Sequence, residues 1–244
     1  MTKLSVNLNK IALLRNARGR DFPNLTEFAN WALAAGADGL TIHPRPDQRH
    51  ARYEDIAILK SLCEPSSRPG GVELNIEGYP EQALIDLCIR HRPHQVTLVP
   101  DAPDQLTSDH GWQVSKHEAL LRPILQRLRD AGIRSSLFMD LSIDEIHAAK
   151  AVGADRIELH TESYARSFEQ QTHEQHIQGF VKAYQTATAI GMGVNAGHDL
   201  NLDNLAFFLA KVPVQEVSIG HALTVEALID GWQPTITRYK SLCQ

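Results

Sequence analysis

Short apolar, often β-branched runs alternate with longer segments of helical periodicity along the whole chain, and this alternation limits the fold most strongly. Consecutive parallel strands need long, right-handed crossovers, so strict strand–helix alternation implies a parallel sheet. Eight strand–helix units favour an α/β fold in which one (β/α)₈ TIM barrel with extra helices spans residues 1–244. The alternative, an open Rossmann-like sheet, is weakened because no G-x-G-x-x-G follows the first strand. The expected strands are Leu4–Leu8, Gly39–Ile42, Val72–Ile76, Gln95–Val99, Arg134–Met139, Arg156–Leu159, Gly193–Asn195 and Glu216–Ile219.

The segments between these strands carry helix signals. Asn24 followed by Glu27 predicts a capped helix start, and Ser142 followed by Glu145 predicts a capping box. Apolar residues at helical spacing then define the body of each helix. Among the expected helices are Tyr53–Cys63, Glu174–Ile190 and Thr224–Tyr239.

Two connections are unusually long for a barrel. Pro100–His117 follows strand four and is rich in Asp, Pro, Ser and Gly, and Thr161–Thr172 follows strand six. Long loops on the carboxyl side of barrel strands are commonly lids or binding loops, so we expect both to border the site.

Composition excludes several classes of partner. The chain has 244 residues, close to the roughly 250 of a typical barrel, and a formal net charge of −5 without clustered Lys or Arg. We therefore expect no nucleic-acid or membrane partner. The three cysteines are far apart and none forms a C-x-x-C pair, which is typical of reduced thiols in a cytoplasmic protein. We also expect no signal peptide, because the first ten residues lack an apolar run.

Polar residues collect directly after the strands, where a barrel gathers them around one opening. Histidines at five of these positions could exchange protons near neutral pH. A solvated loop histidine is an equal explanation for any single one of them, but a weaker one for the whole set. The strand-end residues are Asn7, Asn9, Lys10, His43, Arg45, His50, Asn75, Glu77, Asp140, Glu158, His160, Asn195, His198, Gly220 and His221.

Three short motifs suggest anion binding. NAGHDL at 195–200 and SIGHAL at 218–223 place a Gly–His turn after each of the last two strands, where barrels often bind phosphate through backbone amides. HPRPDQRH at 43–50 adds two arginines that could clamp a phosphate or carboxylate. The simpler alternatives are tight turns and a solvated charged loop.

Metal and Schiff-base chemistry are not favoured. The sequence contains no H-E-x-x-H motif, and His173 and His176 stand at the start of a helix that we expect to be exposed. Lys10 is the only lysine near a strand end, and strand six carries none. We therefore expect neither a metal nor a cofactor.

At these motifs the chain resembles the pyridoxine 5′-phosphate synthase family. The similarity runs in order through essentially the whole sequence. The segments that carry it are VNLNKIALLRNARG (6–19), GADGLTIHPRPDQRH (36–50), ELNIEGYP (73–80), VTLVPDAPDQLTSDHGW (96–112), IELHTESYA (157–165), VNAGHDL (194–200) and SIGHAL (218–223).

The resemblance implies a transferase of vitamin B6 biosynthesis with two phosphorylated small-molecule substrates. The family condenses 3-amino-2-oxopropyl phosphate with 1-deoxy-D-xylulose 5-phosphate to pyridoxine 5′-phosphate, releasing phosphate and water. It needs no metal or cofactor, and its members are homo-octamers. The resemblance also implies proton transfer by His43, Glu77 and His198, and a transition-state-stabilising carboxylate at Glu158.

The family pattern further assigns substrate contacts. The amino-ketone phosphate would meet Asn7, Arg18, Gly220 and His221, with Arg18 completing a neighbouring subunit's site. The deoxyxylulose phosphate would meet Arg45, His50 and Thr107, the last in the loop after strand four that resembles the family's closing lid.

The chain departs from the family at three of its expected substrate-binding positions. Asn9 and Lys10 stand where many members have Asp–His, and Asp199 stands where many have Gly. A side-chain contact to substrate at position 9 or 10 would be altered, whereas a backbone contact would not. The carboxylate of Asp199 would repel a phosphate unless it points away.

Two other functions fit the residues without the resemblance. A sugar-phosphate isomerase or epimerase could use the same phosphate-binding turn and would convert one sugar phosphate without an amine. A non-catalytic phosphate-binding protein would need few of the titratable groups that gather at the strand ends, which counts against it.

Overall fold

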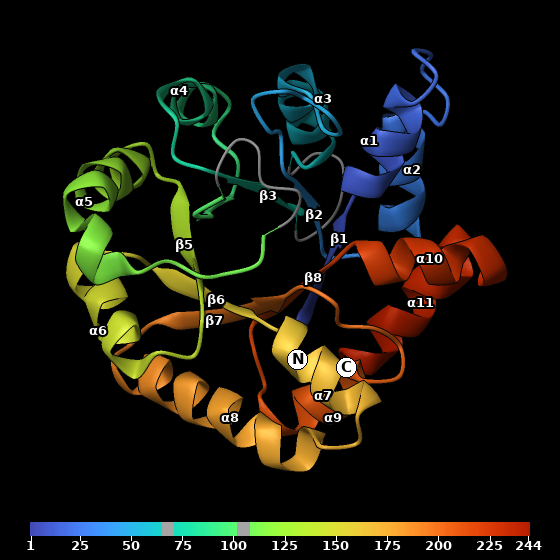
Figure 1. The fold of residues 1–244 in the computed structure, drawn as a ribbon. Coiled ribbons are helices and arrows are strands. Elements are labelled where there is room, and N and C mark those ends of the chain that lie inside the picture. Colours follow the sequence, from blue (N-terminus) through green and yellow to red (C-terminus); the bar gives the residue numbers. More distant parts are fainter. Residues whose placement is uncertain (65–70, 102–107) are drawn as a thin grey trace.

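The computed structural model describes residues 1–64, 71–101 and 108–244, and in it eight parallel strands close a barrel. Each strand pairs with the next, and the eighth pairs with the first. Figure 1 shows the strands at the centre with the helices around them. The strands are β1 (Lys3–Asn7), β2 (Gly39–Ile42), β3 (Glu73–Gly78), β4 (Gln95–Leu98), β5 (Arg134–Met139), β6 (Arg156–His160), β7 (Gly193–Gly197) and β8 (Glu216–Ile219). The expected (β/α)₈ barrel is confirmed.

The helices follow the strands in the expected alternation. Asn24 and Ser142 cap their helices, because each side-chain oxygen accepts a hydrogen bond from the backbone amide three residues on. The carboxylate of Glu145 turns instead to Ser115, so the reciprocal bond of the predicted capping box is not made. The helices are α1 (Asn9–Asn16), α2 (Leu25–Ala34), α3 (Tyr53–Leu62), α4 (Gln82–His91), α5 (Val114–Asp130), α6 (Ile143–Val152), α7 (Glu162–Glu169), α8 (His173–Ala189), α9 (Leu205–Lys211), α10 (His221–Asp230) and α11 (Trp232–Leu242).

Two expectations about the connections are wrong, and one helix is not predicted. The segment 161–172, expected to be a loop, contains α7, a short helix that is held mainly by tertiary packing of Tyr164 against Phe180 and Phe208. The last helix is two helices, α10 and α11, separated at Gly231. Asn9 and Lys10, expected directly after the first strand, form the first turn of α1, a helix that the sequence patterns do not predict.

Side chains alternate between the two faces of the barrel wall, as strand geometry requires. On β1, Leu4 and Val6 are fully buried in the apolar core. Ser5 is also buried, and its hydroxyl is 2.7 Å from that of Thr41 on β2. The apolar core therefore lies between the strands and the helices, whereas the barrel interior is polar.

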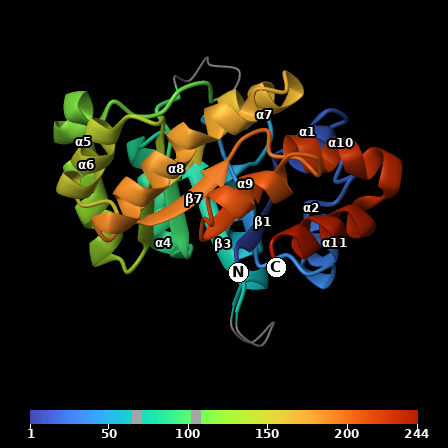
Figure 2. The same cartoon turned by 90° about the horizontal axis from the view of Figure 1, so that it is seen from below.

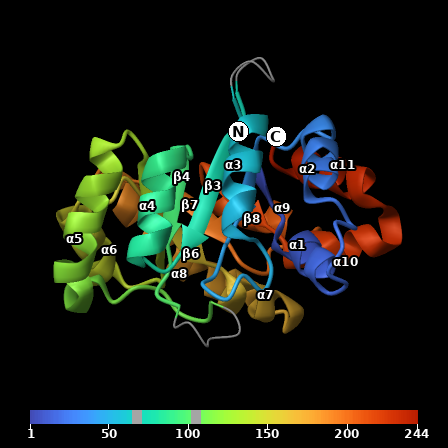
Figure 3. The ribbon, with the colours of Figure 1, turned by 90° about the horizontal axis from the view of Figure 1, so that it is seen from above.

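The two chain ends meet at the closed end of the barrel, where the amide of Thr2 donates to the carbonyl of Cys243 at 3.0 Å. In Figures 2 and 3, α1 and α7 lie toward the opposite end, where the strands finish. Cys63, Cys88 and Cys243 are buried free thiols. Within the part of the chain that the structure describes, no helix is both long and apolar enough to span a bilayer.

The segment that follows the loop after β4 is pinned to β5 at Gly111 and Trp112. The amide of Trp112 donates to the carbonyl of Phe138 at 2.9 Å, and its indole donates to the carbonyl of Leu98 at 2.9 Å. Gly111 passes so close to β5 that a Cβ there would lie 2.2 Å from the amide nitrogen of Asp140. Only glycine fits without moving backbone.

We predict that Gly111→Ala destabilises the protein by about 1–3 kcal/mol, the usual cost of overpacking. The control is Gly179→Ala within α8, where the added methyl group would meet only the tip of the Leu141 side chain. That change should be neutral or stabilising, because alanine favours a helix interior by about 1 kcal/mol over glycine. Thermal unfolding of both variants tests this, and equal Tm values for Gly111→Ala and the wild type would contradict it.

Candidate active site

The carboxyl ends of the strands enclose a cavity of about 610 Å³. Twelve of the fourteen expected site residues line it, although they come from six strands and the loops beyond them. Of the other two, Arg18 is exposed just beyond α1 and Thr107 lies outside the described residues. The twelve are Asn7, Asn9, Lys10, His43, Arg45, His50, Glu77, Glu158, His198, Asp199, Gly220 and His221.

Two asparagines connect the first three strands at the cavity floor. The amide group of Asn7 donates to Glu77 at 3.3 Å, and its oxygen accepts from the backbone amide of Asn9 at 3.0 Å. The side-chain oxygen of Asn9 accepts from the backbone amide of His43 at 2.8 Å. Asn9, at which this chain departs from its family, therefore holds the backbone of His43, one of the expected catalytic residues.

The start of α10 forms an amide-rich corner beside Asn7. Gly220 precedes the first turn of α10, whose backbone amides are unpaired within the helix and carry partial positive charge. A Cβ at Gly220 would lie 2.9 Å from the Cβ of Asn7, so glycine lets the two segments touch. Such a corner can hold a phosphate group, and His221 borders it.

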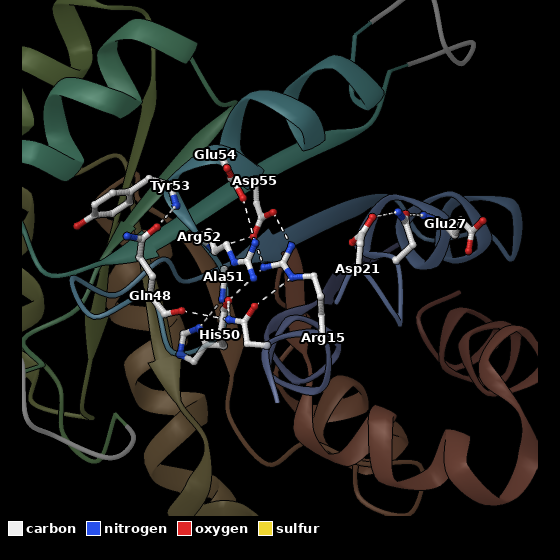
Figure 4. Close-up of polar contacts among 12 residues, drawn as sticks. Arg15, Asp21, Glu27, Gln48, His50, Ala51, Arg52, Tyr53, Glu54 and Asp55 are labelled. Atoms are coloured by element: carbon white, nitrogen blue, oxygen red, sulfur yellow. Dashed lines mark hydrogen bonds and ion pairs between the residues drawn. The ribbon is translucent and has the colours of Figure 1, made fainter. Parts of the chain in front are cut away.

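Side chains of α1 anchor the loop between β2 and α3, residues 43–52 (Figure 4). The side-chain amide of Asn16 donates to the carbonyl of His50 at 2.7 Å, and to those of Gln48 and Arg49. Arg15 makes a bidentate ion pair with the buried Asp55, at 2.7 and 2.9 Å. These contacts fix the backbone position of His50, which lines the cavity.

Arg45 reaches the cavity as expected, but it is shared with a carboxylate. Its guanidinium is paired with Asp101, and both side chains are almost completely buried. Ser108 donates to the same carboxylate at 2.7 Å. Asp101 thus holds the guanidinium of Arg45 in place at the entrance, since a buried charge needs a partner.

The two histidines of this loop are kept neutral. Burial lowers the pKa of His43 well below its usual value, and the positive charge of Arg45 lowers it further. The same two causes lower the pKa of His50 to about 4. Its Nδ1 accepts a hydrogen bond from the amide of Ala51 at 3.0 Å, which a protonated Nδ1 could not do. Both rings are therefore unprotonated at neutral pH.

The two glutamates of the cavity favour their protonated forms. Burial raises the pKa of Glu77 to about 7, and the negative charge of Asp101 adds to this. Burial also raises the pKa of Glu158 well above its usual value, followed by the charge of Glu77. A carboxyl group with a pKa near 7 can donate and accept protons in one cycle.

His198 has the opposite character. Burial alone would lower its pKa, but the hydrogen bond and charge of Asp199, with the charge of Glu77, raise it above the usual value. Its Nδ1 lies 2.8 Å from the Asp199 carboxylate. Its ring also packs against His160, with centroids 5.0 Å apart and planes at 90°. The cavity therefore combines two histidines whose pKa is lowered with one whose pKa is raised.

Three functional contacts were not expected from the sequence. Ser218 donates to Glu77 at 3.5 Å, Thr97 donates to Glu158 at 3.4 Å, and Asp101 pairs with Arg45. Ser218 stands two residues before Gly220 in SIGHAL and faces inward, so strand alternation could have indicated it. The pairing of Asp101 depends on a contact across 56 residues, which no local signal reveals.

Metal binding finds no support in the described ranges 1–64, 71–101 and 108–244. No three side chains among His, Cys, Asp and Glu gather there in a way that could hold a metal ion. The expectation that the protein needs neither metal nor cofactor stays a prediction.

Comparison with known proteins gives a consistent result along the chain. A family model described as pyridoxal phosphate biosynthesis protein PdxJ matches residues 4–244. A pyridoxine 5′-phosphate synthase of Parabacteroides distasonis is 48% identical over 242 residues, covering 99% of this chain and 98% of the relative. The protein of the same name from Brucella abortus is 48% identical over 239 residues, covering 97% and 96%.

Solved structures of other barrels resemble the fold. Phosphoribosylanthranilate isomerase from Thermotoga maritima has a TM-score of 0.59 at 14% identity, covering 100% of this chain and 98% of that one. N-(5′-phosphoribosyl)anthranilate isomerase from Pyrococcus furiosus has a TM-score of 0.61 at 9% identity, with the same coverage. At these identities the likeness shows the fold alone.

We predict that Glu77→Gln stabilises the protein at pH 8 but not at pH 4. The pKa of about 7 against a usual 4.5 means that the charged form is disfavoured only in the folded state. The cost is absent below pH 4.5, grows up to pH 7 and then stays constant, reaching at most about 3 kcal/mol. Glutamine, which is never charged, avoids it.

Thermal unfolding from pH 4 to pH 8 measures this difference. The control is Glu169→Gln, at an exposed position at the end of α7, whose Tm should follow the wild type at every pH. A Glu77→Gln variant that is less stable than the wild type at pH 8 would show that the charge is not disfavoured there.

Proposed function

Because the chain belongs to the PdxJ family of pyridoxal phosphate biosynthesis proteins, whose curated relatives are named pyridoxine 5′-phosphate synthase, we propose that it catalyses this synthesis. The substrates would be 3-amino-2-oxopropyl phosphate and 1-deoxy-D-xylulose 5-phosphate, and the products pyridoxine 5′-phosphate, phosphate and water. The observation that carries the proposal is one cavity with opposed proton acceptors and donors between two anion-binding corners.

The reaction needs several successive proton transfers for imine formation, eliminations and ring closure. His43 is neutral and buried beside Arg45, so it acts as a base. Glu77, with a pKa of about 7, shuttles protons in both directions at the cavity floor. His198, whose pKa the carboxylates of Asp199 and Glu77 raise against the effect of burial, acts as the acid. Because these groups are held around one substrate position, each proton transfer occurs within the complex and needs no separate encounter with an acid or base from solution.

Glu158 lies deeper, on β6, and is hydrogen-bonded to Thr97. Its carboxyl group is buried, and its charged form is strongly disfavoured without a cation. A positively charged imine intermediate would supply that cation and draw Glu158 into its ionised form. The carboxylate then stabilises the intermediate more than the neutral substrate, which is the requirement for catalysis.

Two corners would hold the two phosphates. The first combines the amides at the start of α10 with Gly220, His221 and Asn7, and would bind the amino-ketone phosphate. The second combines Arg45 and His50 on the loop held by α1, and would bind the deoxyxylulose phosphate. Thr107 remains a proposed third contact there.

We predict that His43→Ala and Glu77→Gln each lose at least about 100-fold in kcat while the barrel stays folded, since general acid–base groups typically contribute that much. The assay mixes purified protein with both phosphorylated substrates and follows pyridoxine 5′-phosphate by mass and absorbance. Circular dichroism confirms the fold of each variant.

Wild-type turnover in either variant would contradict the assigned roles. Folded wild-type protein that forms no pyridoxine 5′-phosphate would contradict the function itself. Conversion of a single sugar phosphate without the amine would instead favour an isomerase or epimerase. Ligand-induced stabilisation without any product would favour a binding protein.

We also propose that the chain assembles with itself into a homo-octamer, as its family resemblance implies. Helices α1 and α10 lie side by side on the barrel's outer face (Figure 1) and expose apolar side chains. Leu228 and Ile229 are 78% and 84% exposed, and Leu13, Leu14 and Val225 are 41–49% exposed on the same two helices. Arg18, exposed next to α1, would reach a neighbouring subunit's cavity.

Light scattering should give a mass of eight times 27.1 kDa. Leu228→Asp combined with Ile229→Asp should reduce this mass, because a charge on an apolar interface is costly to bury. A monomeric wild-type protein would contradict the proposal. A variant that keeps the full mass would place the interface elsewhere.

A further inference from the structure

We propose that Asp199 is a positioning residue for His198, accepting a hydrogen bond from its Nδ1–H so that the ring exchanges protons through Nε2. The role of His198 rests on the proposed function, whereas the pairing itself rests on geometry. Asp199 was expected to act on the substrate directly, as a residue facing a phosphate. Its carboxylate is instead engaged with the adjacent imidazole, at 2.8 Å from Nδ1.

Neighbouring side chains in a strand point to opposite faces, so this contact requires an unusual backbone. His198 has φ of 86° and Asp199 has φ of 60°, both in the left-handed region that non-glycine residues rarely occupy. The two left-handed residues end β7 and turn both side chains toward the cavity, which both line.

The backbone of this turn is fixed on both sides. The hydroxyl of Thr161, the residue after β6, donates to the carbonyls of Gly197 and His198. The side-chain amide of Asn204 donates to the carbonyl of Asp199 at 3.2 Å. The His198–Asp199 pair therefore has one defined geometry, and its strain is compensated by these bonds.

Charges from every surrounding element act on the pair. Asp199 on the same loop, Glu77 on β3 and Glu162 on α7 all favour the imidazolium, and burial opposes it. His160 on β6 and His221 on α10 favour the ionised form of Asp199. The hydrogen bond and charge of Asp199 are the largest contributions that raise the pKa of His198, so its removal should leave burial dominant.

The pairing gives His198 a definite role in proton exchange. As an acid, the imidazolium gives its Nε2 proton to a leaving oxygen of the substrate and becomes the neutral Nδ1–H tautomer. Asp199 favours that tautomer, because a carboxylate accepts from Nδ1–H and cannot donate to a bare Nδ1. A later deprotonation of the substrate returns the proton to Nε2, so the ring ends as it began.

Histidine ring NMR tests the pairing without any substrate. The protein is labelled with ¹³C and ¹⁵N in histidine, and the His198 signal is identified by its absence in His198→Gln. We expect an Nδ1–H tautomer and a pKa above 6.5 in the wild type. Asp199→Asn should keep the tautomer, because the amide oxygen still accepts from Nδ1–H, but lower the pKa by about 1–3 units.

Asp199→Gly removes both the charge and the acceptor, and glycine fits the left-handed backbone better than aspartate. This variant should therefore be at least as stable as the wild type, yet lose both the raised pKa and the tautomer preference. The control Asp203→Asn removes an exposed carboxylate four residues away and should leave the His198 titration unchanged. If Asp199 had a merely structural role, Asp199→Gly would be less stable than the wild type but would leave the pKa and tautomer of His198 unchanged.

The alkaline limb of the kcat/KM profile for pyridoxine 5′-phosphate formation should move to lower pH in Asp199→Asn by the same shift. An unchanged His198 titration in Asp199→Asn would overturn the proposal. A shifted titration in a protein that forms no pyridoxine 5′-phosphate would sustain the pairing while refuting the proposed function.

Discussion

The constraint on which the site depends is the narrow polar interior that eight parallel strands enclose. Inward-facing carboxyl groups from β3, β6 and β8 share this space, and those of Glu158 and Glu216 are almost completely buried. Burial is the first cause that raises the pKa of Glu77, Glu158 and Glu216, and each carboxyl group also feels the charge of another. The barrel closure that organises the fold therefore also sets the protonation states of the site.

The sequence was sufficient for the barrel and for most of the cavity lining, because both follow from short-range patterns. The strands β2, β5 and β8 have the predicted bounds, and residues directly after strands meet at one opening as barrel geometry demands. The reach of each side chain was harder to infer. Arg45 was expected to be available for phosphate, but its pairing with Asp101 depends on how two distant loops meet.

At residues 9, 10 and 199 the chain departs from its family. There too, the sequence alone was not sufficient to infer what each side chain contacts. The side chain of Asn9 serves the backbone of His43, so its identity bears on the substrate only indirectly. α1 begins at that residue, and the helix start was missed because eight residues with exposed Leu13 and Leu14 give a weak core-facing pattern. From the sequence, Asp199 was expected to repel a phosphate unless it points away. In the structure, the left-handed backbone at His198 and Asp199 brings its carboxylate to Nδ1 of His198.

The cavity has two sides with opposite effects on histidine: the pKa is lowered on the β2 side and raised on the β7 side. On the β2 side, burial and the positive charge of Arg45 lower the pKa of His43 and His50, so both rings are unprotonated at neutral pH. On the β7 side, burial opposes but the carboxylates of Asp199 and Glu77 outweigh it and raise the pKa of His198, so this ring is protonated more readily. Glu77 on β3 has a pKa of about 7, which burial and the charge of Asp101 raise and the charge of His198 lowers. If a substrate bound between the two sides loses a proton to the β2 side and gains one from the β7 side, one positive charge moves from His198 to the β2 side, and a later step must return it.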